Sequence, residues 1–178
     1  MWTGLLPSGT DRSDPPCVSA DLRGPRWLAQ HVYGDDPGVQ DADALAYCMA
    51  LMVCARGDGF LAPEEREWIT GLAASLAGPE VADAVAAFEP AGTVQEFLKA
   101  KPVPLSARRA IVLDAMRACA ADGELREGEW DSVMALASVL GVGETEITAI
   151  KKLFRDERSL QERRRPVLFP ENLATGQK

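Results

Sequence analysis

Two acidic side chains flank the same short turn twice in this sequence. The segment 58–61, Asp-Gly-Phe-Leu, is followed by Glu65, and 64 residues later the segment 122–125, Asp-Gly-Glu-Leu, is followed by Glu129. Carboxylate oxygens bind hard divalent cations, and they also accept hydrogen bonds from backbone N–H groups at the start of a helix. The repeated turn is therefore either a metal site or an architectural device, and the residues leave both interpretations open.

On the metal interpretation, the candidate ligands are the four acids of the turns and one further carboxylate. Asp114 lies two helical turns before Asp122 on the same face of the expected helix, which makes it an additional candidate. Two carboxylates per turn would leave water to complete the shell of a calcium, magnesium or zinc ion, so a modest affinity is expected. The full candidate set is Asp58, Glu65, Asp114, Asp122 and Glu129.

The turn also matches the second half of an EF-hand calcium loop, but a conventional EF-hand is not expected. Such a loop needs oxygen ligands two and four residues before this Asp. Those positions hold Arg56 and Cys54 in the first copy, and Ala120 and Ala118 in the second. The side-chain oxygens that an EF-hand requires are therefore missing from both copies.

The similarity between the two copies extends into the segments that must position the acids. In each turn the Gly permits a left-handed backbone conformation, and the Leu is expected to enter the core. Apolar residues on both sides of the turns match at the same offset, which predicts two related helical hairpins, at about 41–78 and 106–142, with approximate internal symmetry. The matching pairs are Met52 and Met116, Ile69 and Val133, Leu72 and Leu136, Ala73 and Ala137, and Leu76 and Leu140.

The remaining pattern is helical throughout. Apolar residues recur at helical spacing, capping residues precede several of these segments, and no segment sustains the alternation of a β-strand. We therefore expect an all-α fold, a compact bundle of seven or eight helices, over residues 25–157. An irregular arm is expected at 1–24 and an extended tail at 158–178.

Composition and charge exclude several classes of protein. The chain has 178 residues and a net charge of −8, so nucleic acid is not expected as a partner, because phosphate binding needs a basic face. The dense basic run at 163–165 favours a solvated tail, with contact to an anion or a membrane surface as the less favoured interpretation. The longest apolar run, 44–55, is too short to span a bilayer.

The four cysteines and the start of the chain point to the cytoplasm. No two cysteines form a Cys-x-x-Cys pair, and Cys48, Cys54 and Cys119 fall in expected helix interiors, which is typical of reduced core thiols. The first residues lack the basic start and apolar stretch of a signal peptide. The sequence therefore predicts a cytoplasmic protein that does not itself span a membrane.

The motifs that would support catalysis are missing. The sequence has no Gly-x-Ser-x-Gly, no P-loop and no Gly-x-Gly-x-x-Gly. A di-iron enzyme in a helical bundle needs Glu-x-x-His on two helices, and the single histidine, His31, lies outside the repeat. We therefore expect a protein that acts by binding and not as an enzyme.

The duplicated turn resembles the tellurite-resistance family TerB, and the related N-terminal domain of a membrane-anchored DnaJ-type cochaperone. The resemblance rests on Ala-Asp-Gly-Glu-Leu at 121–125 with Glu129, on the apolar helix that follows, and on the first copy of the turn. It covers about residues 40–155. The first copy departs from the pattern at Arg56 and Gly57, where the family usually has small apolar or acidic residues.

The resemblance carries expectations about function. It implies a compact helical bundle whose acidic turns bind a metal cation, in the setting of oxyanion and envelope-stress resistance. It also implies partners among membrane-embedded proteins of the TerC type and calcium-binding proteins of the TerD type, which places the chain in the cytoplasm or against the inner face of the membrane. The function expected is a non-enzymatic TerB-like module that binds a divalent cation, a protein partner or both. The alternative is a metal-free scaffold or adaptor domain whose acids are structural.

Overall fold

The computed structural model describes residues 27, 29–34 and 41–170, and within them every regular element is helical. The expected all-α bundle is confirmed. The described elements include a π-helical turn, η1 (Ala29–Tyr33), and two 3₁₀ turns, η2 (Arg56–Asp58) and η3 (Leu105–Ala107). The α-helices of the described part are α2 (Asp41–Ala55), α3 (Pro63–Ala77), α4 (Pro79–Ala86), α5 (Val94–Ala100), α6 (Arg108–Cys119), α7 (Glu127–Val139) and α8 (Glu144–Leu168).

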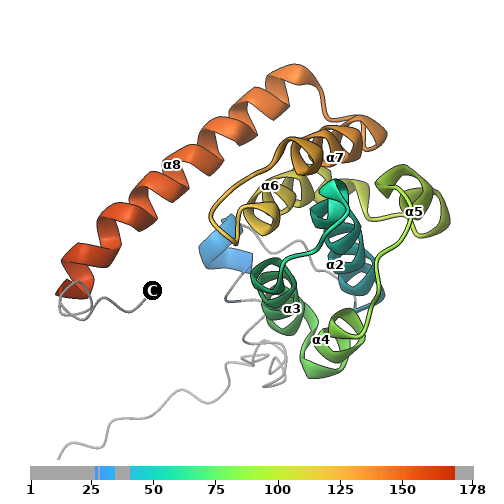
Figure 1. Ribbon diagram of the computed structural model, residues 1–178, viewed down its shortest axis with the longest axis horizontal. Coiled ribbons are helices and arrows are strands. Elements are labelled where there is room, and N and C mark those ends of the chain that lie inside the picture. Colours follow the sequence, from blue (N-terminus) through green and yellow to red (C-terminus); the bar gives the residue numbers. More distant parts are fainter. Residues whose placement is uncertain (1–26, 28, 35–40, 171–178) are drawn as a thin grey trace, which may run out of the picture.

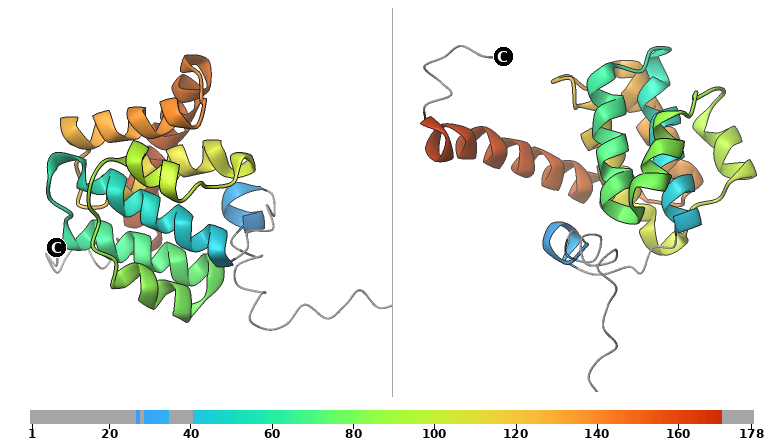
Figure 2. Two further views of the ribbon diagram at one scale, coloured as in Figure 1. Left: turned by 90° about the vertical axis from the view of Figure 1, so that its right-hand side faces the viewer. Right: turned by 90° about the horizontal axis from the view of Figure 1, so that it is seen from below.

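The apolar helix α2 forms the centre of the bundle. Beyond Asp43 it carries no charged side chain, and its residues from 47 to 55 are all buried. It packs against α3, α4, α5, α6 and α7, which surround it in Figures 1 and 2. A helix that is apolar on all sides is stable only when neighbours cover every face, and this arrangement provides them.

The two hairpins predicted from the repeat are present as α2–α3 and α6–α7. Each hairpin joins its helices through one copy of the acidic turn, and α2 and α6 pack against each other between them. Ile69 and Val133 are fully buried at equivalent places, as are Ala73 and Ala137. The matched apolar positions therefore form one shared core, which brings the two turns to the same region of the molecule.

Helix α8 is longer than the sequence predicted. It continues to Leu168, so the expectation of an extended tail from 158 is wrong for residues 158–168. This stretch is rich in Leu, Gln, Glu and Arg, all good helix formers, and Pro166 comes only two residues before the end. The end of the expected tail, 171–178, and the expected arm, 1–24, lie outside the described residues.

Two further expectations concern thiols and membranes. Cys48, Cys54 and Cys119 are buried and free, as predicted, whereas Cys17 lies outside the described residues. None of the described helices combines the length and the apolar character needed to cross a membrane.

Candidate functional site

The two turns meet because a pair of glycines lets their backbones touch. A Cβ atom on Gly57, just before the first turn, would lie 2.5 Å from the carbonyl oxygen of Gly128 in α7. A Cβ atom on Gly128 would lie 3.0 Å from the Cα atom of Asp58. Side chains at either position would separate the first turn from the start of α7, so these glycines determine how closely the acids of the two copies approach.

Each Asp holds its own turn with one carboxylate oxygen. Asp58 Oδ1 accepts a hydrogen bond from the backbone N–H of Phe60 at 2.9 Å, and Asp122 Oδ1 accepts one from Glu124 at 3.0 Å. The glycine that follows each Asp has a positive φ, 96° at Gly59 and 110° in the second copy. The expected left-handed turn is therefore present twice, and it uses half of each carboxylate.

Each Glu likewise uses one oxygen to hold the backbone before its helix. Glu65 Oε2 accepts a hydrogen bond from the Ala62 N–H at 2.8 Å, and Glu129 Oε2 accepts one from Arg126 at 2.8 Å. Glu96 makes the same contact with a backbone N–H at the start of α5, but it is exposed. Glu65 and Glu129 are fully buried, although capping alone does not require the burial of a carboxylate.

The second oxygens of three of these acids converge on one guanidinium. Arg126 Nη2 lies 2.5 Å from Asp122 Oδ2, and its Nη1 lies 3.2 Å from Glu129 Oε1. The same Nη1 lies 3.8 Å from Asp58 Oδ2 in the other turn. The two hairpins therefore bring acids from both copies around a single cationic centre, which is Arg126.

The fourth acid, Glu65, has a buried oxygen without a donor. Its Oε1 atom is inaccessible to solvent and accepts no hydrogen bond among the described residues. Burial raises the pKa of Glu65 to about 8, with further upward contributions from the neighbouring Glu129 and from Asp122. Near neutral pH this carboxyl therefore holds a proton.

We name Asp58, Glu65, Asp122, Glu129 and Arg126 the turn cluster. It unites the four turn acids predicted from the sequence, and it adds an arginine that the sequence reasoning missed. The signal was available, because Arg126 stands between Asp122 and Glu129 at the spacings of a helical turn. No three His, Cys, Asp or Glu side chains in the described part of the chain are arranged to hold a metal ion as they stand.

The structure places Asp114, the fifth candidate ligand, in a separate network. Its Oδ2 atom accepts hydrogen bonds from the hydroxyls of Tyr33 and Tyr47, both at 2.7 Å. Its Oδ1 atom accepts one from Arg117 Nη1 at 2.8 Å, and Arg117 Nη2 in turn lies 2.7 Å from Glu157 in α8. These contacts join η1, α2, α6 and α8, so Asp114 connects helices in the structure and lies apart from the acids of the turns.

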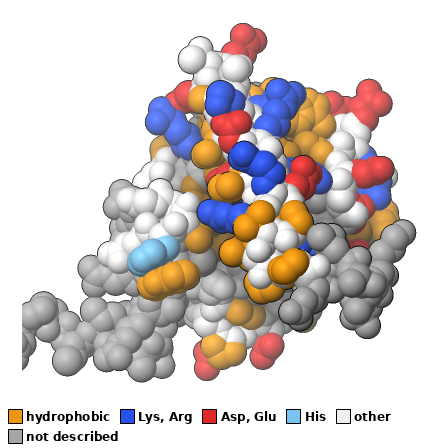
Figure 3. Space-filling model, turned by 90° about the vertical axis from the view of Figure 1, so that its left-hand side faces the viewer, with side chains coloured by type: hydrophobic (Ala, Val, Ile, Leu, Met, Phe, Trp, Pro, Cys, Tyr) orange, Lys and Arg blue, Asp and Glu red, His pale blue; other side chains and the backbone are white. Residues whose placement is uncertain are grey.

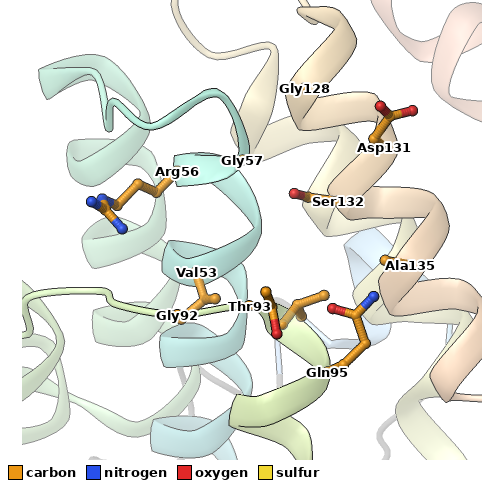
Figure 4. Close-up of a pocket in the computed structure, with 11 residues that line it drawn as sticks. Val53, Arg56, Gly57, Gly92, Thr93, Gln95, Gly128, Asp131, Ser132 and Ala135 are labelled. Carbon is orange, nitrogen blue, oxygen red and sulfur yellow. The ribbon is translucent and has the colours of Figure 1, made fainter.

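A pocket of about 320 Å³ lies at the Gly57–Gly128 contact, and both glycines line it (Figure 4). Residues from α2, η2, α5 and α7 line it. Ser132 points toward Gly57 in Figure 4, whereas the side chains of Arg56 and Asp131 point outward in opposite directions. The charged groups of this pocket do not converge, in contrast to those of the turn cluster.

Comparison with known proteins supports the resemblance drawn from the repeat. No protein-family model matches the chain, and no curated protein matches its sequence. A solved structure, that of a tellurite resistance protein from Nostoc punctiforme, is similar to it with a TM-score of 0.73 and 28% sequence identity. The similarity covers 86% of this chain and 96% of that one. The resemblance is thus confirmed, since the chain has the all-α fold of a solved tellurite resistance protein of the TerB family.

Proposed function

We propose that this chain is a non-enzymatic, TerB-like module of tellurite or envelope-stress resistance, and that its turn cluster binds a divalent cation. The observation that carries the proposal is the convergence of acids from both turns on one positive charge. A protein partner that binds only the cation-bound or only the cation-free form would then respond to whether the cluster holds a cation.

The donor set suits a hard cation. The cluster offers carboxylate oxygens from two turns, and calcium and magnesium prefer oxygen ligands. Four carboxylates close together repel one another, so their approach requires compensating positive charge. Arg126 supplies one positive charge in the structure, and the raised pKa of Glu65 removes one negative charge near neutral pH. A divalent cation would take over this compensation.

Arg126 is able to leave the cluster. Its side chain is 39% exposed, whereas Glu129 beside it is fully buried. Rotation of the arginine into solvent would free the oxygens of Asp122 and Glu129 that it now contacts. The affinity of the cluster for a cation therefore depends on competition with Arg126. We expect the melting temperature of wild type to rise only slightly as the cation is added.

One observation favours the alternative, a metal-free scaffold. Each of the four acids already uses one oxygen to hold the backbone of its own turn. If the second oxygens serve only to neutralise Arg126 and to hold the proton of Glu65, the cluster is a structural connection between the hairpins. The two functions predict opposite results when Arg126 is removed.

The test is a thermal-melt series with calcium, magnesium, manganese or zinc on wild type and on Arg126→Gln. A ligand that binds only the folded state stabilises it by roughly 2.7 kcal/mol at a concentration of a hundred times its Kd. We expect one of these cations to raise the melting temperature of Arg126→Gln at lower concentration than wild type, because the guanidinium no longer competes.

Two control variants complete the series. Asp122→Asn/Glu129→Gln should lose the response to the cation, whereas Glu96→Gln, which removes a similar but exposed helix cap, should keep it. If no cation raises the melting temperature of wild type or of Arg126→Gln, and Asp122→Asn/Glu129→Gln melts lower regardless, the carboxylates are architectural and the scaffold function replaces the proposal.

A further inference from the structure

The end of α8 differs from the rest of the molecule in exposure and in charge. Every described residue from Ser159 to Pro170 is exposed, and the last buried residue of the helix is Phe154. In Figures 1 and 2 this part of α8 extends beyond the other helices. We name residues 159–170 the α8 tip.

The α8 tip is basic although the chain as a whole is acidic. It carries Arg163, Arg164 and Arg165 against the single acid Glu162, whereas the whole chain has a net charge of −8. At a rise of about 1.5 Å per residue, Arg163 lies about 13 Å along the helix from Phe154, the last buried residue. That separation exceeds the Debye length of about 8 Å at physiological salt, so the acidic body does not cancel the field of the three arginines.

Three large apolar side chains follow the arginines, separated from them by Pro166 alone. Val167 is 77% exposed, Leu168 is 62% exposed and Phe169 is 58% exposed. Leu160, two helical turns before Val167, is also exposed. Figure 3, which views the molecule from the side to which α8 points, shows basic and hydrophobic side chains next to each other. Solvent exposure of several apolar side chains together marks an interaction surface.

We propose that the α8 tip binds the surface of an anionic lipid bilayer, with Arg163–Arg165 at the headgroup phosphates and Val167–Phe169 in the boundary with the acyl chains. A bilayer presents both chemistries at one place, negative charge outside and apolar matter just beneath. A soluble anion would use the arginines and leave the apolar residues in water. A nucleic acid would likewise gain nothing from them.

The geometry of the tip also suits a flat surface. The tip is the projecting end of one helix, so it reaches a plane before the acidic body does. Arg117 anchors the helix to the body through Glu157, and Arg158 donates a hydrogen bond to the carbonyl oxygen of Gly123 in the second turn at 3.2 Å. The tip is therefore carried on a fixed part of α8, at a defined distance from the turn cluster.

The expected affinity is modest and depends on salt. Each arginine near an anionic surface strengthens binding by about fivefold, so three give roughly a hundredfold. One polybasic run with a few apolar residues gives reversible attachment and not permanent anchoring. Binding should therefore weaken steeply as the salt concentration rises, because the Debye length shortens.

The test is co-sedimentation of the full chain with vesicles of phosphatidylcholine alone and with vesicles containing 30% phosphatidylserine or phosphatidylglycerol. Wild type should bind only the anionic vesicles, and Arg163→Glu/Arg164→Glu/Arg165→Glu should lose at least roughly a hundredfold in affinity. Val167→Ser/Leu168→Ser/Phe169→Ser should lose about tenfold, since its charge is unchanged but its apolar contact is gone.

The matched control reverses the same number of charges on another face. Arg56→Glu/Lys99→Glu/Lys101→Glu changes exposed bases near α5, away from the tip, and should bind anionic vesicles nearly as wild type does. The proposal is overturned if wild type fails to bind anionic vesicles at low salt, or if the tip variant and the control lose affinity equally. It is also overturned if light scattering shows a dimer that the tip variant abolishes while no variant changes vesicle binding, because the tip then contacts a second copy.

Discussion

The two acidic turns share one backbone design and differ in the residue that precedes each helix. In both turns the Asp caps the loop, the Gly has a positive φ and the buried Glu holds the backbone N–H three residues before it. That third residue is Ala62 in the first copy and Arg126 in the second. The first turn therefore provides acids without a cation of its own, and the second turn provides the cation for both.

This difference shows how a duplicated motif can form one site instead of two. Equal turns with an arginine each would place two guanidinium groups beside each other, and turns with none would leave four carboxylates uncompensated. The repulsion among the acids is reduced differently in the two turns. Arg126 contacts Glu129 in the second turn, whereas the raised pKa of Glu65 keeps a proton on the acid of the first turn. Substitutions at equivalent places in the two turns test this difference.

The largest expected effect comes from separating the turns. Gly57→Ala adds a Cβ atom 2.5 Å from the carbonyl oxygen of Gly128, so the first turn must shift away from α7. We expect a loss of about 3 kcal/mol in the free energy of unfolding, measured by urea denaturation, since overpacking against backbone is not easily relieved. The equivalent residue in the second copy is Ala121, which already carries a Cβ atom, so the requirement belongs to the first turn alone.

A matched glycine gives the control for that variant. Gly71 lies inside α3 with open space where its Cβ atom would be, so Gly71→Ala should stabilise the chain by about 0.5–1 kcal/mol. Equal effects of the two substitutions would show that the contact between Gly57 and α7 does not hold the turns together.

The next effect is a dependence of stability on pH between 5.5 and 8.5, which should come from Glu65 in the first turn. The pKa of Glu65 is raised to about 8 by burial and by Glu129, whereas a Glu in an unfolded chain titrates near ~4.3. Between these values the folded chain binds a proton that the unfolded chain does not, so its stability falls as the pH rises toward 8 and then levels off. Glu65→Gln removes this titration, and its advantage over wild type should grow by about 2 kcal/mol between pH 5.5 and 8.5.

The equivalent substitution in the second turn should behave differently. Glu129→Gln removes the negative partner of Arg126, so it should lower the stability at every pH in that range. Urea denaturation of both variants at pH 5.5, 7 and 8.5 separates the two cases. A constant difference between Glu65→Gln and wild type would contradict the assignment of the proton to Glu65.

The sequence predicted the duplicated hairpins, the shared core and the four turn acids, because helical periodicity and a fixed offset are properties of the chain alone. It did not predict that the acids of both copies meet, since that depends on the contact between Gly57 and Gly128 across two hairpins. The role of Arg126 was not predicted either, because an arginine beside acidic residues is equally compatible with the solvent-exposed start of an ordinary helix. The network of Asp114 with Tyr33 escaped notice for a similar reason, as its members are far apart in sequence.

The helix α8 shows a second limit of the sequence. The run at 163–165 followed by Pro166 suggested an extended tail, because proline ends most helices. The structure continues the helix to Leu168, so the same residues become a projecting basic end. The residue types determine the local preference for helix or coil. Contacts between helices, such as that of Arg117 with Glu157, also support α8, and they depend on the assembled fold.

The smallest expected effect compares the two aspartates of the turn cluster. Asp122→Asn removes a contact of 2.5 Å with Arg126, and we expect a loss of about 1 kcal/mol; Asp58→Asn removes one of 3.8 Å and should cost about 0.3 kcal/mol. The pKa of Asp122 is held below its usual range, first by the N–H of Glu124 and then by Arg126, so its contribution is present at neutral pH and lost as the pH falls through the carboxyl range. The difference between the two variants in urea denaturation should therefore shrink toward pH 3. If Asp58→Asn costs as much as Asp122→Asn at pH 7, Arg126 serves both turns equally and the asymmetry lies in the proton of Glu65 alone.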